Sequence, residues 1–333
     1  MSRRLSRSAG GPGGAVPREN VNELVEGLRS GDRRAVARLI SLVEDGAPEA
    51  SEAIREVYPL TGHASTLGVT GAPGAGKSTL IDGLVTRMRA ADLSVGVIAV
   101  DPTSPFSGGA LLGDRVRMGT HSLDDKVFIR SMATRGHLGG LSLAAPEAMR
   151  VLEAAGSNFV IVETVGVGQS EVEVARQADT TIVVLAPGMG DAIQAAKAGI
   201  LEVADVFSVN KSDKSGVNET ARDVRSMLEM GPGRDPDWTP PIVLTSATEG
   251  EGLDELWEAV RSHEAHLRQG GRLEARRRER FSSEIREIVG ERLKAHLEEA
   301  AGPHVLEQLT DAVLERKLDP YSAAQDLLKR FGL

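Results

Sequence analysis

Short apolar runs alternate with segments of helical periodicity through the middle of the chain. The runs have the length of strands, are rich in β-branched and aliphatic residues, and are apolar throughout rather than at every second position. Continuous apolar strands are typical of sheets that are buried on both faces. We therefore expect an α/β fold with a mostly parallel central sheet flanked by helices. The predicted strands span residues 66–70, 95–100, 127–129, 159–162, 181–185, 206–209 and 242–244, and the predicted helices span 78–90, 145–155, 192–203, 219–228 and 253–266.

Both ends of the chain follow a helical pattern instead. Between residues 19 and 58 apolar residues recur at helical spacing, and a break at Gly31 divides them into two helices. After residue 267 the chain is highly charged, Gly302 interrupts it, and Asp319 before Pro320 is typical of the start of a last helix. We therefore divide the chain into a disordered tail (1–18), an N-terminal helical segment (19–60), a central domain (61–267) and a C-terminal helical arm (268–333).

The arm carries a narrow apolar stripe. Its members recur at spacings of three and four residues: Phe281, Ile285, Ile288, Val289, Leu293 and Leu297. Such a stripe on a long helix favours a partner helix, so we interpret the segment as a dimerisation arm. The alternative is a solvated helical tail that packs on its own domain.

The composition is that of a globular protein and argues against several classes of function. Hydrophobic residues make up 41% of the chain and charged residues 26%. A net charge of -9 and an aromatic content of 3% argue against a nucleic-acid partner, which needs basic surface and stacking side chains. The chain contains no cysteine, which rules out disulfides, zinc–thiolate sites and a thiol nucleophile.

No apolar run reaches the length of a membrane-spanning helix, about 20 residues. We therefore expect no membrane partner and a cytoplasmic location. The tail contains Arg3, Arg4 and Arg7 but no apolar segment behind them, so it does not fit a secretory signal. Its glycine-rich run at 10–14 favours a disordered tail, and its arginine and serine content leaves an organellar transit peptide as the alternative.

The residues after the first predicted strand fit the pattern G-x-x-x-x-G-K-[ST]. A strand before the pattern and a helix after it are the context of a phosphate-binding loop. Glycine lets backbone N–H groups turn toward phosphate oxygens, and the helix N-terminus adds positive potential. In such loops the lysine reaches the β- and γ-phosphates and the serine hydroxyl binds Mg²⁺. The candidate phosphate-binding residues are Gly71, Ala72, Pro73, Gly74, Ala75, Gly76, Lys77, Ser78 and Thr79.

A second motif indicates which base is bound. The sequence N-K-S-D at 210–213 follows the predicted strand 206–209, where a base pocket belongs in a chain with an upstream phosphate loop. A carboxylate there accepts hydrogen bonds from guanine N1–H and N2–H₂, whereas adenine has no donors in that arrangement. The sequence therefore predicts GTP and GDP as ligands. The candidate base-binding residues are Asn210, Lys211 and Asp213, with Ser246, Ala247 and Thr248 after the last strand.

Carboxylates at further strand ends are candidates for Mg²⁺. The string E-T-V-G at 163–166 takes the place of the D-x-x-G motif of GTPases, with glutamate for aspartate. Its carboxylate would hold Mg²⁺ directly or through water, and the N–H of its glycine would bond the γ-phosphate. We therefore assign catalysis to Lys77, Glu163 and Gly166, and the metal to Ser78, Asp101, Asp114 and Glu163.

The residue that orients the attacking water in Ras-like GTPases has no counterpart here. Val167 stands where those proteins carry glutamine, and Gln169 lies two positions further on. We therefore predict slow intrinsic GTP hydrolysis that a partner accelerates. Arg115 is a candidate to reach the phosphates, with a surface ion pair as the equal alternative.

Several strings together resemble the MeaB/ArgK/MMAA group of GTPases over about residues 20–333. Besides the phosphate loop and N-K-S-D, they are V-D-P-T-S (100–104), G-D-R-V-R-M (113–118), R-G-H-L-G-G (135–140), E-T-V-G-V-G-Q-S-E (163–171) and P-G-M-G-D (187–191). The E-T-V-G-V-G-Q-S-E string is the most specific, because ordinary GTPases lack it.

This resemblance implies a SIMIBI-type P-loop fold and a homodimer formed through the C-terminal helices. It also implies a chaperone of an adenosylcobalamin-dependent acyl-CoA mutase, chiefly methylmalonyl-CoA mutase. Members couple GTP binding and hydrolysis to cofactor loading, protection and reactivation of that enzyme. A further switch over residues 188–199 is implied, with Asp191, Gln194 and Lys197 as polar elements, although residues 192–196 are more apolar than the family pattern.

Other functions remain as alternatives. Nickel-insertion GTPases share the fold but typically carry cysteine and histidine ligands, and this chain has no cysteine and seven scattered histidines. A kinase of periplasmic amino-acid-binding proteins is an older assignment attached to the ArgK name, and the chain lacks the kinase strings H-R-D and D-F-G. A protein that binds GTP without turnover is the third alternative.

Overall fold

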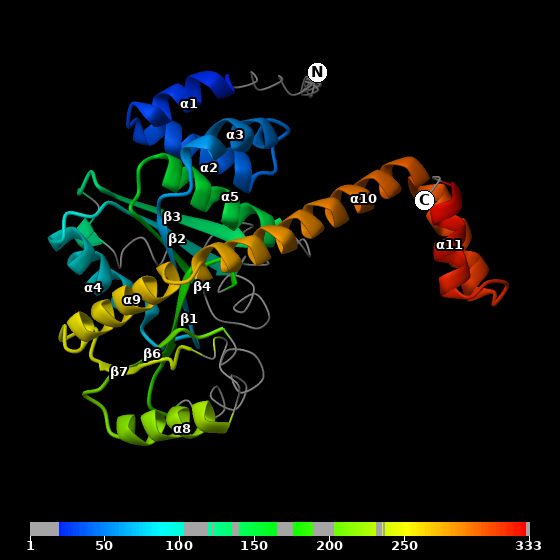
Figure 1. Cartoon of the computed structure of the whole chain (residues 1–333). Coiled ribbons are helices and arrows are strands. Elements are labelled where there is room, and N and C mark those ends of the chain that lie inside the picture. Colours follow the sequence, from blue (N-terminus) through cyan, green and yellow to red (C-terminus); the bar gives the residue numbers. More distant parts are fainter. Residues whose placement is uncertain are drawn as a thin grey trace, which may run out of the picture.

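The computed structural model describes residues 20–102, 119–121, 123–134, 140–164, 176–188, 203–230, 235 and 237–330. At its centre lies a seven-stranded parallel sheet with the order β3-β2-β4-β1-β5-β6-β7 (Figure 1). All predicted strands and the parallel α/β fold are confirmed, while the predicted helix 192–203 lies outside the described residues except for Val203. The strands are β1 (Ser65–Thr70), β2 (Val95–Pro102), β3 (Val127–Thr134), β4 (Phe159–Thr164), β5 (Thr180–Leu185), β6 (Val206–Asn210) and β7 (Ile242–Thr245).

Helices cover both faces of the sheet, as continuous apolar strands require. On one face α4 (Lys77–Ala90) and α9 (Leu253–Arg268) pack on residues such as Leu67, Ile161 and Ile182. On the other face α5 (Gly140–Ala154) packs on the alternate residues of the same strands, including Val160 and Val162. Helix α8 (Val217–Met230) packs on β5 and β6.

The N-terminal segment forms three short helices, of which the second and third pack on α5 and the first packs on those two (Figure 1). They are α1 (Val21–Arg29), α2 (Arg33–Glu44) and α3 (Ala50–Val57), followed by the 3₁₀ turn η1 (Tyr58–Leu60). The break predicted at Gly31 is confirmed, because Asp32 caps α2 by accepting a hydrogen bond from the N–H of Arg34 at 2.8 Å. Helix α3 is an addition to the two predicted helices.

The C-terminal segment runs away from the sheet as a long helix (Figure 1). It consists of α10 (Arg272–Leu314) and α11 (Pro320–Arg330). The predicted interruption is confirmed as a kink at Gly302, whose φ of 61° and ψ of 165° are not helical. Asp319 caps α11, as predicted, by accepting the N–H of Tyr321 at 2.9 Å.

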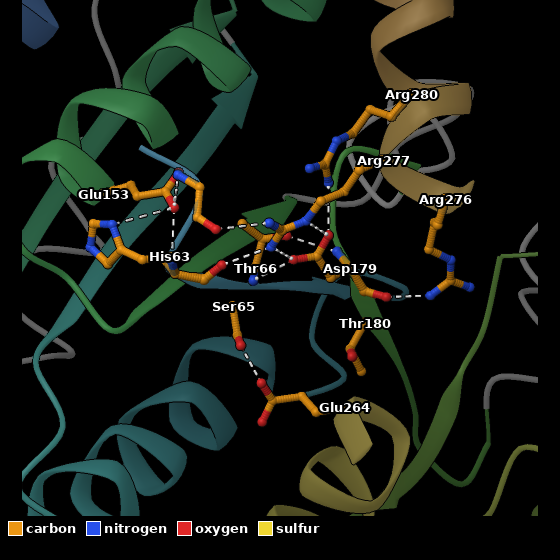
Figure 2. A network of polar contacts seen from close by, with 12 residues as sticks. His63, Ser65, Thr66, Glu153, Asp179, Thr180, Glu264, Arg276, Arg277 and Arg280 are labelled. Carbon is orange, nitrogen blue, oxygen red and sulfur yellow. Dashed lines mark hydrogen bonds and ion pairs between the residues drawn. The ribbon is translucent and has the colours of Figure 1, made fainter. Parts of the chain in front are cut away.

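Arginines in the first turns of α10 bind aspartates at the amino ends of the strands, the edge opposite the phosphate loop. Arg277 pairs with Asp179, which precedes β5, at 2.7 Å between Nη2 and Oδ2. Arg280 adds a contact to Asp179 at 3.3 Å, and Arg276 pairs with Asp205, which precedes β6, at 2.7 Å. Figure 2 shows how the arginines converge from one helix on the buried Asp179. These ion pairs fasten the base of α10 to the sheet.

Candidate functional site

The candidate phosphate loop connects β1 to α4 at the carboxyl edge of the sheet. Because all strands are parallel, the residues that follow β4, β6 and β7 reach the same edge. Crevices at the carboxyl ends of parallel strands are the usual ligand sites of such folds. The fold therefore brings the phosphate loop, Glu163, Asn210 and Ser246 to one side of the molecule.

The glycines of the loop occupy positions that reject other side chains. Gly71 has a φ of 137°, and a Cβ there would collide with the carbonyl oxygen of Val184 in β5. Gly76 has a φ of 96°, and a Cβ there would collide with the side-chain nitrogen of Asn210. As the N-cap of α4, Gly76 makes no side-chain capping hydrogen bond, so it leaves the first N–H groups of the helix to a ligand.

Lys77 is buried and folded over its own loop. Its ammonium donates to the carbonyl oxygens of Gly71 at 2.6 Å and Ala72 at 3.2 Å. A buried ammonium in this position brings a full positive charge to the loop whose N–H groups also favour anions. This arrangement suits a polyphosphate.

Ser78 and Glu163 meet at the base of the loop. The Ser78 hydroxyl donates to Oε1 of Glu163 at 2.7 Å, and both side chains are buried. A hydroxyl and a carboxylate side by side offer the hard oxygen ligands that Mg²⁺ prefers, so these residues fit that ion. Asp101 lies in β2, in register one step beyond the pair Val100–Thr164 of β2 and β4. The candidates Asp114 and Gly166 lie outside the described residues, as does Arg115.

The candidate base-binding residues lie beside the same loop. The side-chain nitrogen of Asn210 donates to the carbonyl oxygen of Ala75 at 2.8 Å, and its oxygen accepts from the N–H of Ala247 at 3.1 Å. Lys211, which adopts a left-handed conformation with a φ of 61°, donates to the carbonyl oxygen of Gly74 at 2.6 Å. The N-K-S-D motif is therefore tied to the phosphate loop on one side and to the end of β7 on the other.

The carboxylate expected to select the base is exposed. Asp213 accepts a hydrogen bond from the Ser246 hydroxyl at 3.3 Å. Ala247 is half-buried and Thr248 is exposed in the following turn. The open position of Asp213 beside these backbone groups fits recognition of a base edge.

Sequence reasoning missed the threonines that support this site. Thr245 donates to the side-chain oxygen of Asn210 at 3.2 Å and shares a hydrogen bond of 2.8 Å with Ser208. Thr70 and Thr164 share another of 3.0 Å beneath the loop. The available signal was a hydroxyl residue in an otherwise apolar strand, because a buried hydroxyl needs a partner.

Two further expectations concern metals and membranes. Within the described ranges, no three histidine, aspartate or glutamate side chains gather in a way that would hold a metal ion. His121, one of the seven histidines, lies in the 3₁₀ turn η2 (Gly119–His121), 3.6 Å from Asp82. His137 lies outside the described residues. None of the helices in the described part of the chain is long and apolar enough to cross a bilayer.

Comparison with known proteins matches the chain to one family. Residues 36–302 match the family described as methylmalonyl Co-A mutase-associated GTPase MeaB. A protein of Pyrococcus abyssi named as a GTPase is 49% identical over 93% of this chain and 96% of its own length. GTPase ArgK of Escherichia coli is 40% identical over 83% of this chain and 85% of its own length.

A mitochondrial protein and a crystal structure extend these similarities. The mouse (Mus musculus) protein named methylmalonic aciduria type A homolog, mitochondrial, is 34% identical over 93% of this chain and 79% of its own length. A crystal structure titled LAO/AO transport system kinase is 31% identical, with a TM-score of 0.72 over 96% of this chain and 100% of that one.

Proposed function

Because the chain belongs to the family of methylmalonyl Co-A mutase-associated GTPases MeaB, and is a P-loop GTPase, we propose that it serves as the GTP-dependent chaperone of an adenosylcobalamin-dependent acyl-CoA mutase. In this role it regulates cofactor loading, protection and reactivation of the mutase. The client that we propose first is methylmalonyl-CoA mutase. The observation that carries the proposal is the family match over residues 36–302, together with the phosphate loop, Ser78 and Glu163 at one sheet edge.

Each group of the proposed site has a defined task. The amides of loop 71–79 bind phosphate oxygens, and Lys77 places its charge against the β- and γ-phosphates. Ser78 and Glu163 hold Mg²⁺ with Asp101 and Asp114, and the N–H of Gly166 bonds the γ-phosphate. When bound, Mg²⁺ offsets the negative charge that develops as water attacks the γ-phosphorus. The base is held by Asn210, Lys211, Asp213, Ser246, Ala247 and Thr248.

The proposed rate of hydrolysis follows from the sequence after Gly166. Val167 has no hydrogen-bonding side chain with which to orient a water molecule. Intrinsic turnover is therefore slow, and the mutase accelerates it by supplying or ordering the missing group. A slow GTPase of this kind acts as a switch whose state depends on the bound nucleotide, and the segment 188–199 transmits that state to the partner.

The mutase partnership is tested by binding that depends on the nucleotide. The full chain is loaded with GDP or with a non-hydrolysable GTP analogue and titrated with purified methylmalonyl-CoA mutase in the cytoplasmic pH range. We expect affinities that differ between the two nucleotide states, because a GTPase switch must bind its partner differently in each state. Equal affinity in both states, or no binding, contradicts the proposal. Failure with this mutase and success with another acyl-CoA mutase changes only the identity of the client.

We also propose that the protein is a homodimer held by α10 and α11. Ile285, Val289 and Leu293 lie four residues apart on α10 and are 60%, 50% and 42% exposed. Three apolar side chains in a row on a helix that leaves the body of the molecule favour a second copy as partner.

Light scattering after size exclusion tests the dimer. Ile285→Asp with Val289→Asp should halve the mass, whereas Leu123→Asp, at an apolar residue that is 95% exposed but distant from α10 in sequence, should leave it unchanged. A monomeric wild-type protein contradicts the arrangement.

A kinase activity is the second candidate, and a specific observation favours it. The solved structure with a TM-score of 0.72 is titled a transport system kinase. The two functions differ in the acceptor of the γ-phosphoryl group, which is water in a GTPase and a protein side chain in a kinase. Incubation with γ-labelled GTP or ATP and a periplasmic amino-acid-binding protein separates them. Label on the protein supports the kinase, and label in free phosphate alone supports the GTPase.

A further inference from the structure

A pair of buried threonines joins the two strand ends that lead to the phosphate loop and to Glu163. Thr70 is the last residue of β1 and Thr164 is the last residue of β4. Oγ1 of Thr164 donates to Oγ1 of Thr70 at 3.0 Å, and both side chains are buried. Gly71 follows Thr70 directly, and Glu163 precedes Thr164 directly. The hydrogen bond therefore lies at the point where the sheet gives way to the site.

This contact continues the pairing of the two strands by one step. The register of β1 with β4 runs from the pair Ser65–Phe159 to the pair Val69–Glu163. Thr70 and Thr164 come next in that register. At this step Thr70 pairs with Val183 of β5 and Thr164 pairs with Val100 of β2, so the side-chain hydrogen bond is what links β1 directly to β4 here.

Neither threonine faces the metal side of the site. Successive side chains of a strand point to opposite faces, so Thr164 shares its face with Val162 and α5, whereas Glu163 points with Ile161 toward α4 and Ser78. Substituting Thr164 therefore removes no group that contacts Ser78. Any effect on the Ser78–Glu163 pair has to pass through the backbone of β4.

We propose that Thr70 and Thr164 are positioning residues that keep the end of β4 in register with the start of the phosphate loop, and so hold the Glu163 carboxylate beside the Ser78 hydroxyl for Mg²⁺. The proposal rests on the assignment of Ser78 and Glu163 to the metal. Oγ of Ser78 and Oε1 of Glu163 are 2.7 Å apart, and both side chains are buried. A shift of β4 by a fraction of that distance would therefore break their alignment.

Stability and positioning are separated by comparing single and double variants. Thr164→Val or Thr70→Val leaves one buried hydroxyl without its partner, which lowers the melting temperature whatever the pair does. Thr70→Val with Thr164→Val removes both hydroxyls and restores most of the stability, because no unpaired polar group remains. Thr164→Ser keeps the hydroxyl and serves as the conservative control.

Dissociation of N-methylanthraniloyl-GDP is followed by fluorescence at a series of Mg²⁺ concentrations. The readout is the Mg²⁺ concentration at which retention of the nucleotide is half of its maximum. We expect the double variant to need about five- to tenfold more Mg²⁺ than wild type despite its recovered melting temperature, the size of one net hydrogen bond. Its affinity for the nucleotide in EDTA should equal that of wild type. Thr164→Ser should need the wild-type concentration.

Three outcomes overturn the inference. The first is a double variant with the wild-type Mg²⁺ requirement, which makes the pair a purely structural contact. The second is a Thr164→Ser protein that behaves as Thr164→Val does, which shows that side-chain shape matters and the hydroxyl does not. The third is a wild-type protein that retains the nucleotide equally with and without Mg²⁺. This third result also overturns the metal assignment, whereas the first two leave that assignment intact.

Discussion

Replacing Asp179 with asparagine tests how α10 is held to the sheet. The change keeps the shape of the side chain but removes its charge, and it leaves the guanidinium groups of Arg277 and Arg280 without their carboxylate. Burial alone would raise the pKa of Asp179, but the hydrogen bond from Arg277 and the charges of both arginines lower it below its usual value. The carboxylate is therefore ionised at neutral pH, and its negative charge is what the variant removes.

The cost of the change follows from burial. The side chains of Asp179 and Arg277 are 4% and 21% exposed, so water replaces the lost partner of the arginines only in part. Breaking a buried ion pair by removing one member lowers the free energy of unfolding by about 3–5 kcal/mol. This is a large share of the total for a typical protein, which is about 5–15 kcal/mol. With a urea dependence of about 3 kcal/mol per molar, the unfolding midpoint should fall by about 1–2 M.

Urea unfolding followed by circular dichroism measures this shift, and an exposed ion pair provides the control. Asp92 pairs with Lys126 at 2.8 Å, close to the 2.7 Å between Asp179 and Arg277, but its side chain is 82% exposed. Asp92→Asn should leave the midpoint unchanged, because water and salt screen such pairs. Equal midpoints for the two variants would refute the claim that the buried pair anchors α10.

The lowered pKa of Asp179 also sets a pH dependence. A carboxyl group with a lowered folded-state pKa contributes stability above its unfolded pKa, about 3.9, and loses it as the pH falls through the folded value. The difference in midpoint between wild type and Asp179→Asn should therefore stay constant above about pH 5 and shrink in stronger acid. A difference that grows in acid contradicts this assignment.

Three further variants probe other parts of the account. Burial raises the pKa of Glu147 to about 7, against its attraction to Arg150. The carboxyl group ionises near pH 4.5 in the unfolded chain but only near pH 7 in the folded one, so the fold loses stability as the pH rises between these values. Glu147→Gln should therefore be more stable than wild type at pH 8, by up to about 3 kcal/mol, with the gain absent at pH 4.5 in thermal melts. Gly71→Ala should lower nucleotide affinity at least tenfold in a fluorescence titration, because the added Cβ collides with the Val184 carbonyl and its φ of 137° disfavours alanine. Asp213→Ala should weaken GTP at least tenfold but leave weak ATP binding unchanged in competition titrations, and an equal loss for both nucleotides speaks against base recognition.

The sheet could be predicted because its strands carry their own signal. Continuous apolar runs such as 159–162 and 181–185 leave little choice but a buried parallel sheet, and the structure confirms each one. The ends of the strands were predicted less accurately. β3 continues to Thr134, whereas the predicted strand ended at residue 129, because the polar Arg130 broke the apolar run. In the structure Arg130 pairs with Glu44 of α2 at 2.8 Å. A charged residue whose partner is distant in sequence gives no periodic signal.

The site was predictable where chemistry dictates sequence and not where packing does. The loop glycines, Lys77 and Ser78 form a contiguous pattern that exists because phosphate must approach the backbone. Ser78 and Glu163 were both assigned to the metal from the sequence, and the structure places their side chains 2.7 Å apart. The roles of Thr70, Thr164 and Thr245 were not predicted, because a threonine in a strand looks like any other β-forming residue until its partner across the sheet is known.

The base of α10 shows the same limit on a larger scale. Charged residues at 276–280 gave the segment the pattern of a solvated helix, yet Arg276, Arg277 and Arg280 bind buried aspartates far away in the chain. Asp179 and Asp205 precede strands and read as loop residues. Only the tertiary fold shows that these charges satisfy one another.

The most direct test of the central claim is the rate of GTP hydrolysis by the full chain, measured alone and with purified methylmalonyl-CoA mutase. A Lys77→Ala variant, which loses the charge facing the phosphates but keeps the fold, serves as the control in both mixtures. We predict slow hydrolysis by the wild-type protein, faster hydrolysis when the mutase is present, and none above background for Lys77→Ala. Hydrolysis that the mutase leaves unchanged, or full activity in the Lys77→Ala variant, would contradict the central claim.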